Sequence, residues 1–322
     1  MNNILITSAG KRVSLILAFQ KELKRIFPKA KVYAADADPS LAAACIIADG
    51  WFKVPRLDDP NYIKELITIC QTNSISLIVP TIDTELLVLA ENENLLKYES
   101  IITVISSVEF INKCRDKRLI HEFFESMGID VAKEYSKDKL RFPIFIKPRN
   151  GSRSVDTHIV KKKEDLLEYQ LKNKKYMFLE YLDPIDYQEY TCDLYYSKDN
   201  KLKCAVPRKR IEVRDGEVNK GKTEKNELAK CIIDNLFIIE GARGCLTVQF
   251  FINRINRRIV GIEINPRFGG GFPLTYFAGG NYPKWIIKEY LLGEELTFFE
   301  DWESDLLMLR YDNEILVHGF NE

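Results

Sequence analysis

The chain has little cysteine or histidine, and this limits the chemistry that it can carry. It contains seven cysteines and three histidines in 322 residues, with no C-x-x-C pair and no Cys/His spacing typical of zinc sites. We therefore expect no Cys/His metal site and no nucleophile arrangement of Ser, His and Asp. The scattered cysteines are typical of small apolar side chains in a reducing compartment.

Net charge and long apolar runs are also missing. Lys plus Arg and Asp plus Glu are equal at 47 each, so an anion site must come from a local cluster and nothing favours nucleic acid. No apolar stretch approaches the roughly 20 residues that a membrane span needs. The start, MNNILITSAGKR, lacks the segments of a signal peptide. We expect a cytoplasmic protein with neither nucleic-acid nor membrane partners.

The first loop lacks the glycines of the common nucleotide-binding fingerprints. TSAGKRVS has one glycine, so it matches neither G-x-G-x-x-G nor G-x-x-x-x-G-K-[ST]. Asp36 resembles the acid that binds a ribose in dinucleotide folds, but the glycines that belong with it are absent. Two interpretations of Lys11 and Arg12 stay open. With the first amides of the following helix they could hold an anion such as a carboxylate, or they are solvated residues of a plain turn.

Two patterns divide the chain near residue 107. Before it, strand-like runs such as NILITS (3–8), KVYAADAD (31–38) and SLIVPT (76–81) alternate with amphipathic helical runs such as 12–27. Alternation of this kind predicts a parallel sheet with helices on its faces. The first part is therefore expected to be a parallel α/β domain.

The second part has another pattern. Ser106 and Glu109 form an S-x-x-E capping box, which predicts a helix over 108–128 that ends at Gly128. Closely spaced strand-like runs follow, which predict α+β structure with mostly antiparallel pairing. The further helices expected here cover residues 163–173, 223–241 and 283–293.

The apolar run in GIEINPRFGGG (261–271) ends with an acidic, an amide and a cationic side chain, namely Glu263, Asn265 and Arg267. Side chains two apart on a strand share a face, so Glu263 and Asn265 point the same way. A hairpin through RINR would place Gln249 of the preceding strand beside Glu263. Three oxygen ligands on one sheet face fit Mg²⁺, and Arg267 could bind a phosphate or a carboxylate bidentately. Taken alone, Glu263 could instead be an edge-strand carboxylate paired with an arginine.

A lysine stands at the end of another buried run. Lys147 closes FPIFIKP, and RNGSRS follows it. A buried lysine needs an anion and a Gly/Ser loop offers mobile amides, so the pair is typical of a phosphate clamp that closes over a nucleotide. Lys117 is either a second phosphate contact or part of a solvated helix face. The backbone of FLEYL (178–182) could bond an adenine edge, and Glu189 could accept from ribose hydroxyls.

Together these motifs resemble the ATP-grasp superfamily, and within it single-chain enzymes similar to an ATP-binding half of the carbamoyl-phosphate synthase large subunit. The matching runs, in the family's order, are DKRLIHEFFESMGI, FPIFIKPRNGSRS, FLEYL, QEYTCDLY, LTVQFF and IEINPRFGGG. The resemblance implies an N-terminal parallel α/β domain at 1–107 before a two-subdomain ATP-grasp fold. Residues 108–182 would hold the phosphate-loop hairpin and adenine hinge, and 183–322 the metal-binding strands.

The resemblance also implies a role for each matching residue. The residues expected to bind ATP are Lys117, Lys147, Ser152, Glu180, Tyr181, Leu182 and Glu189. The expected metal ligands are Gln249, Glu263 and Asn265. Lys147 would also act in catalysis, together with Arg267 at the acyl phosphate or its oxyanion and Arg210 at the γ-phosphate or the acid. Gln249 stands where many relatives have Glu, which lowers the charge of the metal site.

The implied activity is an ATP-dependent ligase that activates a carboxylate as an acyl phosphate for attack by an amine, releasing ADP and phosphate. ATP and Mg²⁺, with Mn²⁺ as a substitute, are the expected cofactors. The expected partners are small-molecule carboxylate and amine substrates and a second copy in a homodimer. Two alternatives stay open: a carboxyphosphate-forming enzyme that uses bicarbonate, and a non-catalytic ATP-binding regulatory module.

Overall fold

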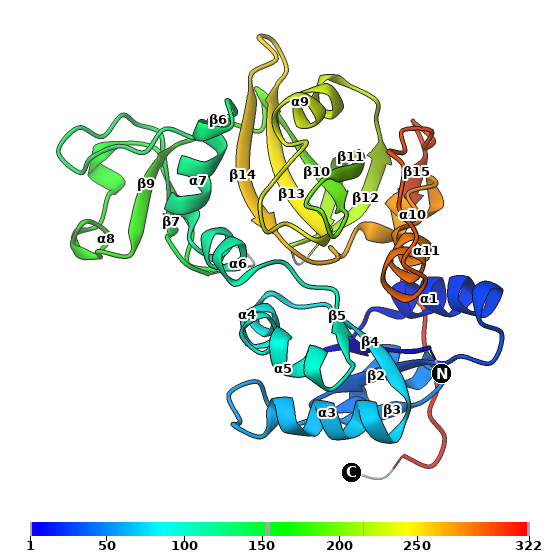
Figure 1. Ribbon diagram of the computed structural model, residues 1–322. Helices are drawn as coiled ribbons and strands as arrows, with labels where there is room; N and C mark the ends of the chain where they lie inside the picture. Colours follow the sequence, from blue (N-terminus) through cyan, green and yellow to red (C-terminus); the bar gives the residue numbers. More distant parts are fainter. Residues whose placement is uncertain (1, 152–154, 215, 321–322) are drawn as a thin grey trace.

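The computed structural model describes residues 2–151, 155–214 and 216–320 and contains three β-sheets (Figure 1). A parallel sheet occupies the first third of the chain, and two mainly antiparallel sheets follow. The predicted combination of α/β and α+β structure is confirmed. None of the described helices is long and apolar enough to cross a membrane.

The first sheet is parallel throughout, in the order β3-β2-β1-β4-β5. Its strands are β1 (Asn3–Thr7), β2 (Val32–Asp36), β3 (Trp51–Lys53), β4 (Ile75–Pro80) and β5 (Ile102–Thr103). Its helices are α1 (Val13–Ile26), α2 (Ala43–Ile47), α3 (Tyr62–Thr72), α4 (Asp83–Glu91) and α5 (Glu93–Tyr98). Every residue of β1 is buried because helices cover both faces of the sheet. The Asp36 carboxylate accepts a hydrogen bond of 3.0 Å from the Gly10 amide, so it closes the first loop of this domain.

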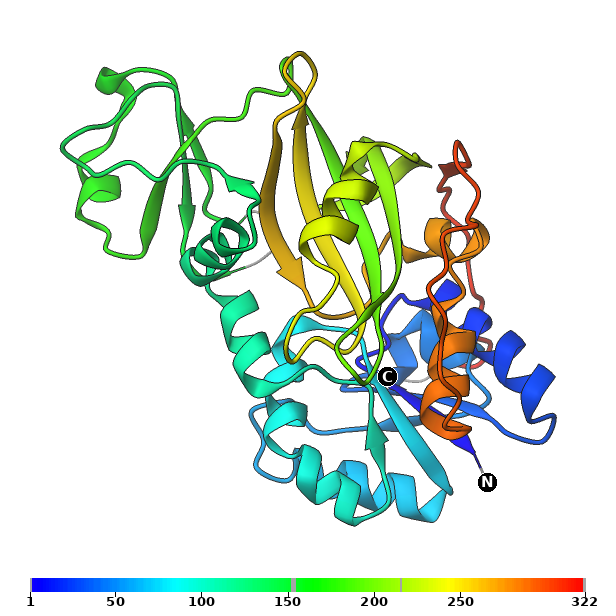
Figure 2. The same cartoon turned by 45° about the horizontal axis from the view of Figure 1, so that its top comes forward.

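A small antiparallel sheet, in the order β8-β7-β9, lies apart from the other two in both views (Figures 1 and 2). Its elements are β7 (Ile144–Pro148), β8 (His158–Val160), β9 (Tyr176–Glu180) and the short helix α8 (Glu168–Lys172). It has an apolar cluster of its own, which includes Ile146, Val160 and Phe178. Only Glu168–Lys172 of the helix predicted over 163–173 forms, after a 3-10 turn at Lys163–Asp165.

The largest sheet has seven strands, in the order β15-β12-β11-β10-β13-β14-β6. All neighbours pair antiparallel except β14 and β6. The strands are β6 (Asp130–Val131), β10 (Tyr187–Tyr196), β11 (Leu202–Arg214), β12 (Glu217–Thr223), β13 (Gly244–Asn253), β14 (Ile259–Asn265) and β15 (Leu307–Leu309). The helices of this part are α6 (Val108–Arg115), α7 (Lys117–Ser126), α9 (Glu227–Asn235), α10 (Phe272–Phe277) and α11 (Tyr282–Ile286).

Helix boundaries differ from the prediction in this part of the chain. The single helix expected over 108–128 is two helices, broken at Asp116, whose extended backbone and side chain cap α7. The cap of α6 is Ser107, which accepts from the Phe110 amide at 3.2 Å, so the predicted capping box at Ser106 was wrong by one residue. Helix α10 was not predicted, and a π-helical turn at Ile287–Leu291 follows α11.

The first and last parts of the chain share one apolar core. Helix α1 packs against α10 and α11, and the ring centroids of Phe19 and Phe268 lie 6.0 Å apart. The Glu22 carboxylate, buried in α1, accepts from the Tyr276 hydroxyl at 2.9 Å. Both figures show the orange C-terminal helices lying beside blue α1. The large sheet is thus fixed against the N-terminal domain.

Candidate active site

Lys147 of β7 carries its ammonium group inside the protein, with a side chain only 6% exposed. The pKa of Lys147 is lowered to about 8, mainly by burial and also by the charge of Lys117, against the opposing effect of the Glu263 carboxylate. The two lysines and Glu263 therefore share one electrostatic environment, although they come from β7, α7 and β14. A cationic group held this far from water is matched to a bound anion.

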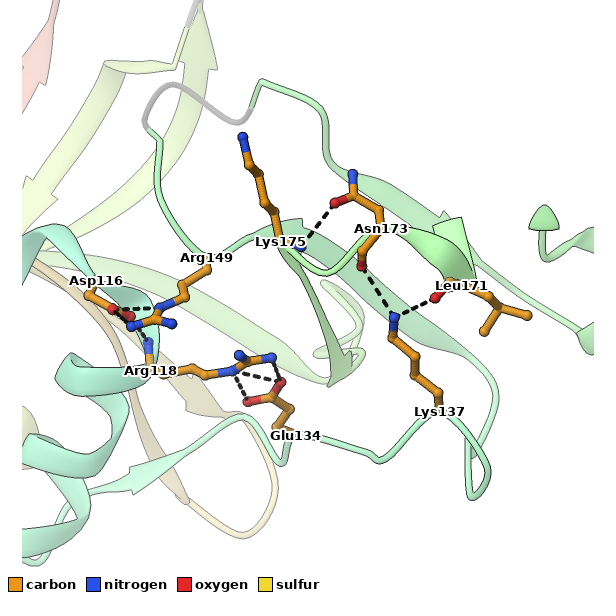
Figure 3. A network of polar contacts seen from close by, with 8 residues as sticks. All are labelled: Asp116, Arg118, Glu134, Lys137, Arg149, Leu171, Asn173 and Lys175. Carbon is orange, nitrogen blue, oxygen red and sulfur yellow. Dashed lines mark hydrogen bonds and ion pairs between the residues drawn. The ribbon is translucent and has the colours of Figure 1, made fainter. Parts of the chain in front are cut away.

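The stem of the loop after β7 is tied to the start of α7 (Figure 3). Arg149 Nε donates to Asp116 Oδ2 at 2.5 Å, and the Lys117 amide donates to the Arg149 carbonyl at 3.0 Å. The Lys117 ammonium reaches the Gly151 carbonyl at 2.6 Å. Ser152, expected to bind phosphate from this loop, lies outside the described residues. These contacts hold the first residues of the expected phosphate loop, Arg149 to Gly151, against the start of α7.

A second group of contacts in Figure 3 braces the small sheet. Arg118 binds Glu134 through both carboxylate oxygens, at 2.7 and 3.1 Å. The Lys137 ammonium donates to the carbonyls of Leu171 and Asn173. These contacts join α7 to the segment between β6 and β7, and that segment to the end of α8.

His121 belongs to this site and was missed from the sequence. It lies one turn after Lys117 on α7, is 6% exposed, and its Nε2 has no hydrogen-bond partner among the described residues. Burial, together with the charges of Lys147 and Lys117, lowers the pKa of His121 to about 3. The ring is therefore neutral over the range in which proteins work. The i, i+4 spacing from Lys117 is the signal that could have found it.

The candidate metal ligands lie on one face of the β13–β14 hairpin. Gln249 pairs directly with Glu263, as the sequence predicted. The Asn265 amide donates to Glu263 Oε1 at 3.2 Å, and the Gln249 amide donates to Glu189. Within the described residues, no hydrogen bond reaches Gln249 Oε1, Asn265 Oδ1 or Glu263 Oε2. Three hard oxygen atoms on one face fit Mg²⁺, although the described residues hold no group of three or more acids, histidines or cysteines placed for a metal.

Glu189 and Arg210 lie beside this face and bind each other. Arg210 Nη1 donates to Glu189 at 2.7 Å, and Arg210 Nη2 donates to the Gly216 carbonyl at 3.1 Å. Burial raises the pKa of Glu189, and Arg210 and Gln249 act against that rise. Glu189 thus holds Gln249 and Arg210 in place, and a ribose would have to compete with both contacts.

The expected adenine hinge has free backbone groups. The Tyr181 and Leu182 amides and carbonyls make no hydrogen bond to other described residues. The Glu180 amide, in contrast, donates to the Lys133 carbonyl at 2.8 Å, and its carboxylate accepts from Arg258 at 2.8 Å. Buried or half-buried backbone groups without partners are available for the edge of a base.

Arg267 is tied to the N-terminal domain. Its Nε and Nη2 donate to Asp83 Oδ2, at 3.0 and 2.7 Å, and its Nη1 donates to the Phe268 carbonyl at 3.3 Å. Asp83 begins α4, so this ion pair joins the end of β14 to the parallel-sheet domain. The ion pair with Asp83 fixes the orientation of the Arg267 guanidinium, and the expected contact with a reacting carboxyl would be made in that orientation.

The glycine run after Arg267 is required by its neighbours. A Cβ on Gly269 would lie 2.7 Å from the Thr247 hydroxyl, and one on Gly270 would lie 2.6 Å from the Glu217 carboxyl carbon. A Cβ on Gly271 would lie 2.1 Å from Nη1 of Arg208. A Cβ at Gly269 or Gly271 would meet buried Thr247 or buried Arg208, whereas at Gly270 the flexible Glu217 carboxylate would have to move.

Arg208 is the largest fully buried side chain and was not among the predicted site residues. It donates to Asp193 at 2.9 Å. Asp193 also accepts from the hydroxyls of Thr247 and Thr275, at 3.0 and 2.6 Å. This network joins β10, β11, β13 and α10 under the glycine run.

Two family models match different parts of the chain. Residues 172–310 match the model described as "ATP-grasp in the biosynthetic pathway with Ter operon", and residues 4–105 match "PylC-like, N-terminal domain". The chain has an ATP-grasp fold that follows a PylC-like N-terminal domain. No curated protein matches the chain.

Solved structures of carboxylases and a synthetase share the fold at low sequence identity. Campylobacter jejuni biotin carboxylase, in a complex with a β,γ-ATP ligand, matches with a TM-score of 0.72 and 15% identity over 95% of this chain and 74% of its own. Staphylococcus aureus N5-carboxyaminoimidazole synthetase with ADP matches with 0.66 and 18% over 89% and 76%. Rhizobium etli pyruvate carboxylase matches with 0.65 and 16% over 87% of this chain, which spans only 27% of that one.

Proposed function

We propose that the chain is an ATP-dependent ligase that activates a carboxylate as an acyl phosphate for attack by an amine. The observation that carries the proposal is the convergence of buried Lys147, Lys117 and the Glu263 face on one site. Cations for phosphates and oxygen ligands for a metal are what γ-phosphoryl transfer requires. The free hinge backbone at Tyr181 and Leu182 would receive the adenine.

The reaction needs no side-chain nucleophile. A substrate carboxylate oxygen attacks the γ-phosphorus of ATP, the bond to ADP breaks, and an acyl phosphate forms. An amine then adds to the carbonyl carbon, phosphate leaves with the bonding electron pair, and the amine loses a proton to give an amide. Lys147 and Lys117 would offset the phosphate charge, and Arg267 would stabilise the oxyanion of the tetrahedral intermediate.

A divalent metal fits the oxygen face of the β13–β14 hairpin. Gln249, Glu263 and Asn265 would hold it, each through an oxygen that has no hydrogen-bond partner in the described structure. When bound, Mg²⁺ neutralises charge on the phosphate oxygens. Glu263 carries the only charge in this set, and the carboxylate of Glu189 lies next to Gln249.

A second function is favoured by the names of the structural neighbours. Biotin carboxylase and N5-carboxyaminoimidazole synthetase share the fold, so a carboxyphosphate-forming enzyme that uses bicarbonate is the alternative. The two functions differ in one requirement. The ligase needs an organic acid and an amine, whereas the alternative needs bicarbonate.

Phosphate release from ATP tests the proposal. We expect wild-type protein with ATP and Mg²⁺ to release phosphate when an acid and an amine from a panel of amino acids and amino sugars are both present, in bicarbonate-free buffer. In a parallel reaction with added bicarbonate and no amine, turnover that depends on the bicarbonate would show the alternative instead. Mass spectrometry of the product identifies the amide.

Two variants show whether the described site performs the reaction. Glu263→Gln removes the charge of the metal face with little change in shape, so we expect kcat to fall by about 100-fold or more. Glu168→Gln is the matched control, because Glu168 is an exposed carboxylate whose partner is Lys172 on the same helix. Equal rates in the two variants would place the reaction elsewhere.

A further inference from the structure

A small polar pocket lies where the N-terminal domain meets the glycine run. Lys11 and Arg12 before α1, Glu217 of β12, Arg310 after β15, and Gly269 and Gly270 line it. Its volume is about 30 Å³, enough for a small polar group or a few waters and too small for a nucleotide. Three separate segments of the chain thus bring charged groups to one cavity beside the glycine run.

The charges in the pocket do not balance. Glu217 accepts from Arg310 at 3.0 Å and lies 3.5 Å from the Lys11 ammonium. Arg267, the next cation, is bound by Asp83. In the described part of the chain, the Arg12 guanidinium makes no hydrogen bond or ion pair. Three cations therefore face one carboxylate, and half-buried Arg12 is the one that has no partner in the described structure.

Arg12 is placed at an energetic cost to the protein. Burial lowers the pKa of Arg12, and the neighbouring charges of Arg267 and Arg310 lower it further, against the attraction of Glu217 and Asp83. For Glu217, burial alone would raise the pKa, but Arg310, Arg12 and Lys11 together lower it. An additional anion between Arg12 and its neighbours would relieve the repulsion.

The floor of the pocket is backbone. Gly270 approaches Glu217 so closely that a Cβ would lie 2.6 Å from its carboxyl carbon. Gly269 and Gly270 follow Arg267 by two and three positions, so the pocket adjoins the expected reacting centre. A substrate held at Arg267 is therefore near enough to place a second group in this pocket.

We propose that Arg12 binds an anionic group of one substrate, a carboxylate or a phosphate that does not itself react. The proposal rests on the ligase function and narrows the range of substrates. The amine or the acid carries a second group that is negatively charged at neutral pH and does not react. A guanidinium binds such an oxyanion bidentately. Amino acids fit this class because they carry an amine and a carboxylate in one small molecule, whereas simple amines do not.

Binding of two probe anions tests the pocket without turnover. Malonate and inorganic phosphate are titrated into wild-type protein saturated with a non-hydrolysable ATP analogue, and binding is followed by calorimetry. The analogue occupies Lys117 and Lys147, so they do not bind the probe. We expect saturable binding of at least one anion, weakened ten-fold or more in Arg12→Gln and less in Arg12→Lys, which keeps the charge but loses the bidentate geometry. The stronger probe shows whether carboxylate or phosphate is the natural group.

The matched control is Arg25→Gln, which removes one positive charge from the exposed end of α1. Arg12→Gln should also raise the melting temperature of the free protein at low salt, because it removes an unpaired charge. Equal anion affinity in wild type and Arg12→Gln, or no saturable binding of either probe, would overturn the proposal. Binding of the ATP analogue is measured first on the same sample. If the analogue does not bind, the probes are titrated without it. Loss of the ATP site is thereby distinguished from loss of the pocket.

Discussion

At the scale of single residues, the buried lysine is the feature most open to measurement. Lys147 is protonated or neutral depending on pH near 8, because burial lowers its pKa to about that value. Lys117, Glu263 and Glu134 are the other charged groups that act on it. His121 nearby stays neutral, with a pKa of about 3. The charge of Lys147 therefore changes near pH 8, and burial also lowers the pKa of Lys117 beside it.

We predict that ATP binding takes up a proton near pH 8 through Lys147. The ammonium form binds phosphate, so affinity is full below the pKa of the free protein and falls as pH rises through it. Between pH 8 and 9 the protonated fraction drops about five-fold, and affinity should drop about as much. Calorimetry with EDTA, in two buffers of different ionisation enthalpy, measures the uptake. Lys147→Arg keeps the charge at all pH values, so an equal uptake in that variant would contradict the assignment.

At the scale of elements, the break between α6 and α7 does more than end a helix. Asp116 caps α7 by accepting from the Arg118 amide at 3.0 Å. It also binds Arg149, the first residue after β7. Two expected ATP contacts, Lys117 and the loop after Arg149, are thereby positioned by one carboxylate. The broken helix is thus part of how the phosphate clamp is held.

Replacing Asp116 by Ala should weaken ATP binding as well as stability. Loss of the cap is expected to lower the free energy of unfolding by about 1 kcal/mol, and loss of the Arg149 contact should raise the ATP dissociation constant roughly five-fold or more. Ser107→Ala is the matched control, since Ser107 caps α6 and has no contact with the loop stem. Urea unfolding and calorimetry measure both quantities. Equal loss of ATP affinity in the two variants would refute the positioning role.

How much the sequence could predict depended on how local each signal is. The pairing of Gln249 with Glu263 follows from strand parity and a short hairpin, so it was predictable. The contact between Arg267 and Asp83 spans 184 positions and depends on how two domains pack, which no local pattern reports. The need for glycine at 269–271 comes from Thr247, Glu217 and Arg208 beneath it. Asp116 broke a predicted helix because its capping contact outweighed the apolar periodicity.

At the scale of the whole molecule, the three sheets are held together unequally. The parallel sheet and the large sheet share a core, with Arg243 bound to Glu93 and Arg267 bound to Asp83 across the junction. The small sheet has its own cluster and meets the rest through a smaller group that includes Leu179. Sheets with few shared contacts open at lower free energy than the rest of a protein.

The small sheet should therefore move separately, as a lid over the nucleotide. In hydrogen exchange of the free protein, we expect amides of β7, β8 and β9 to exchange at least ten-fold faster than those of β10 and β13. ATP with Mg²⁺ should slow exchange in the small sheet and leave β1 and β4 unchanged. Lys147→Met should abolish the slowing. Equal protection of the small and large sheets in the free protein would rule out a separate lid.

The shared core also limits when the N-terminal domain can complete its packing during translation. The apolar face of α1 is completed by α10 and α11, so Phe19 and Phe268 meet only after nearly all the described chain has been synthesised. At typical translation rates of about 5–20 residues per second, the helix waits roughly ten to fifty seconds for those partners. During synthesis, the apolar face of α1 is thus uncovered until α10 and α11 have been made, and in that interval it is open to other apolar surfaces.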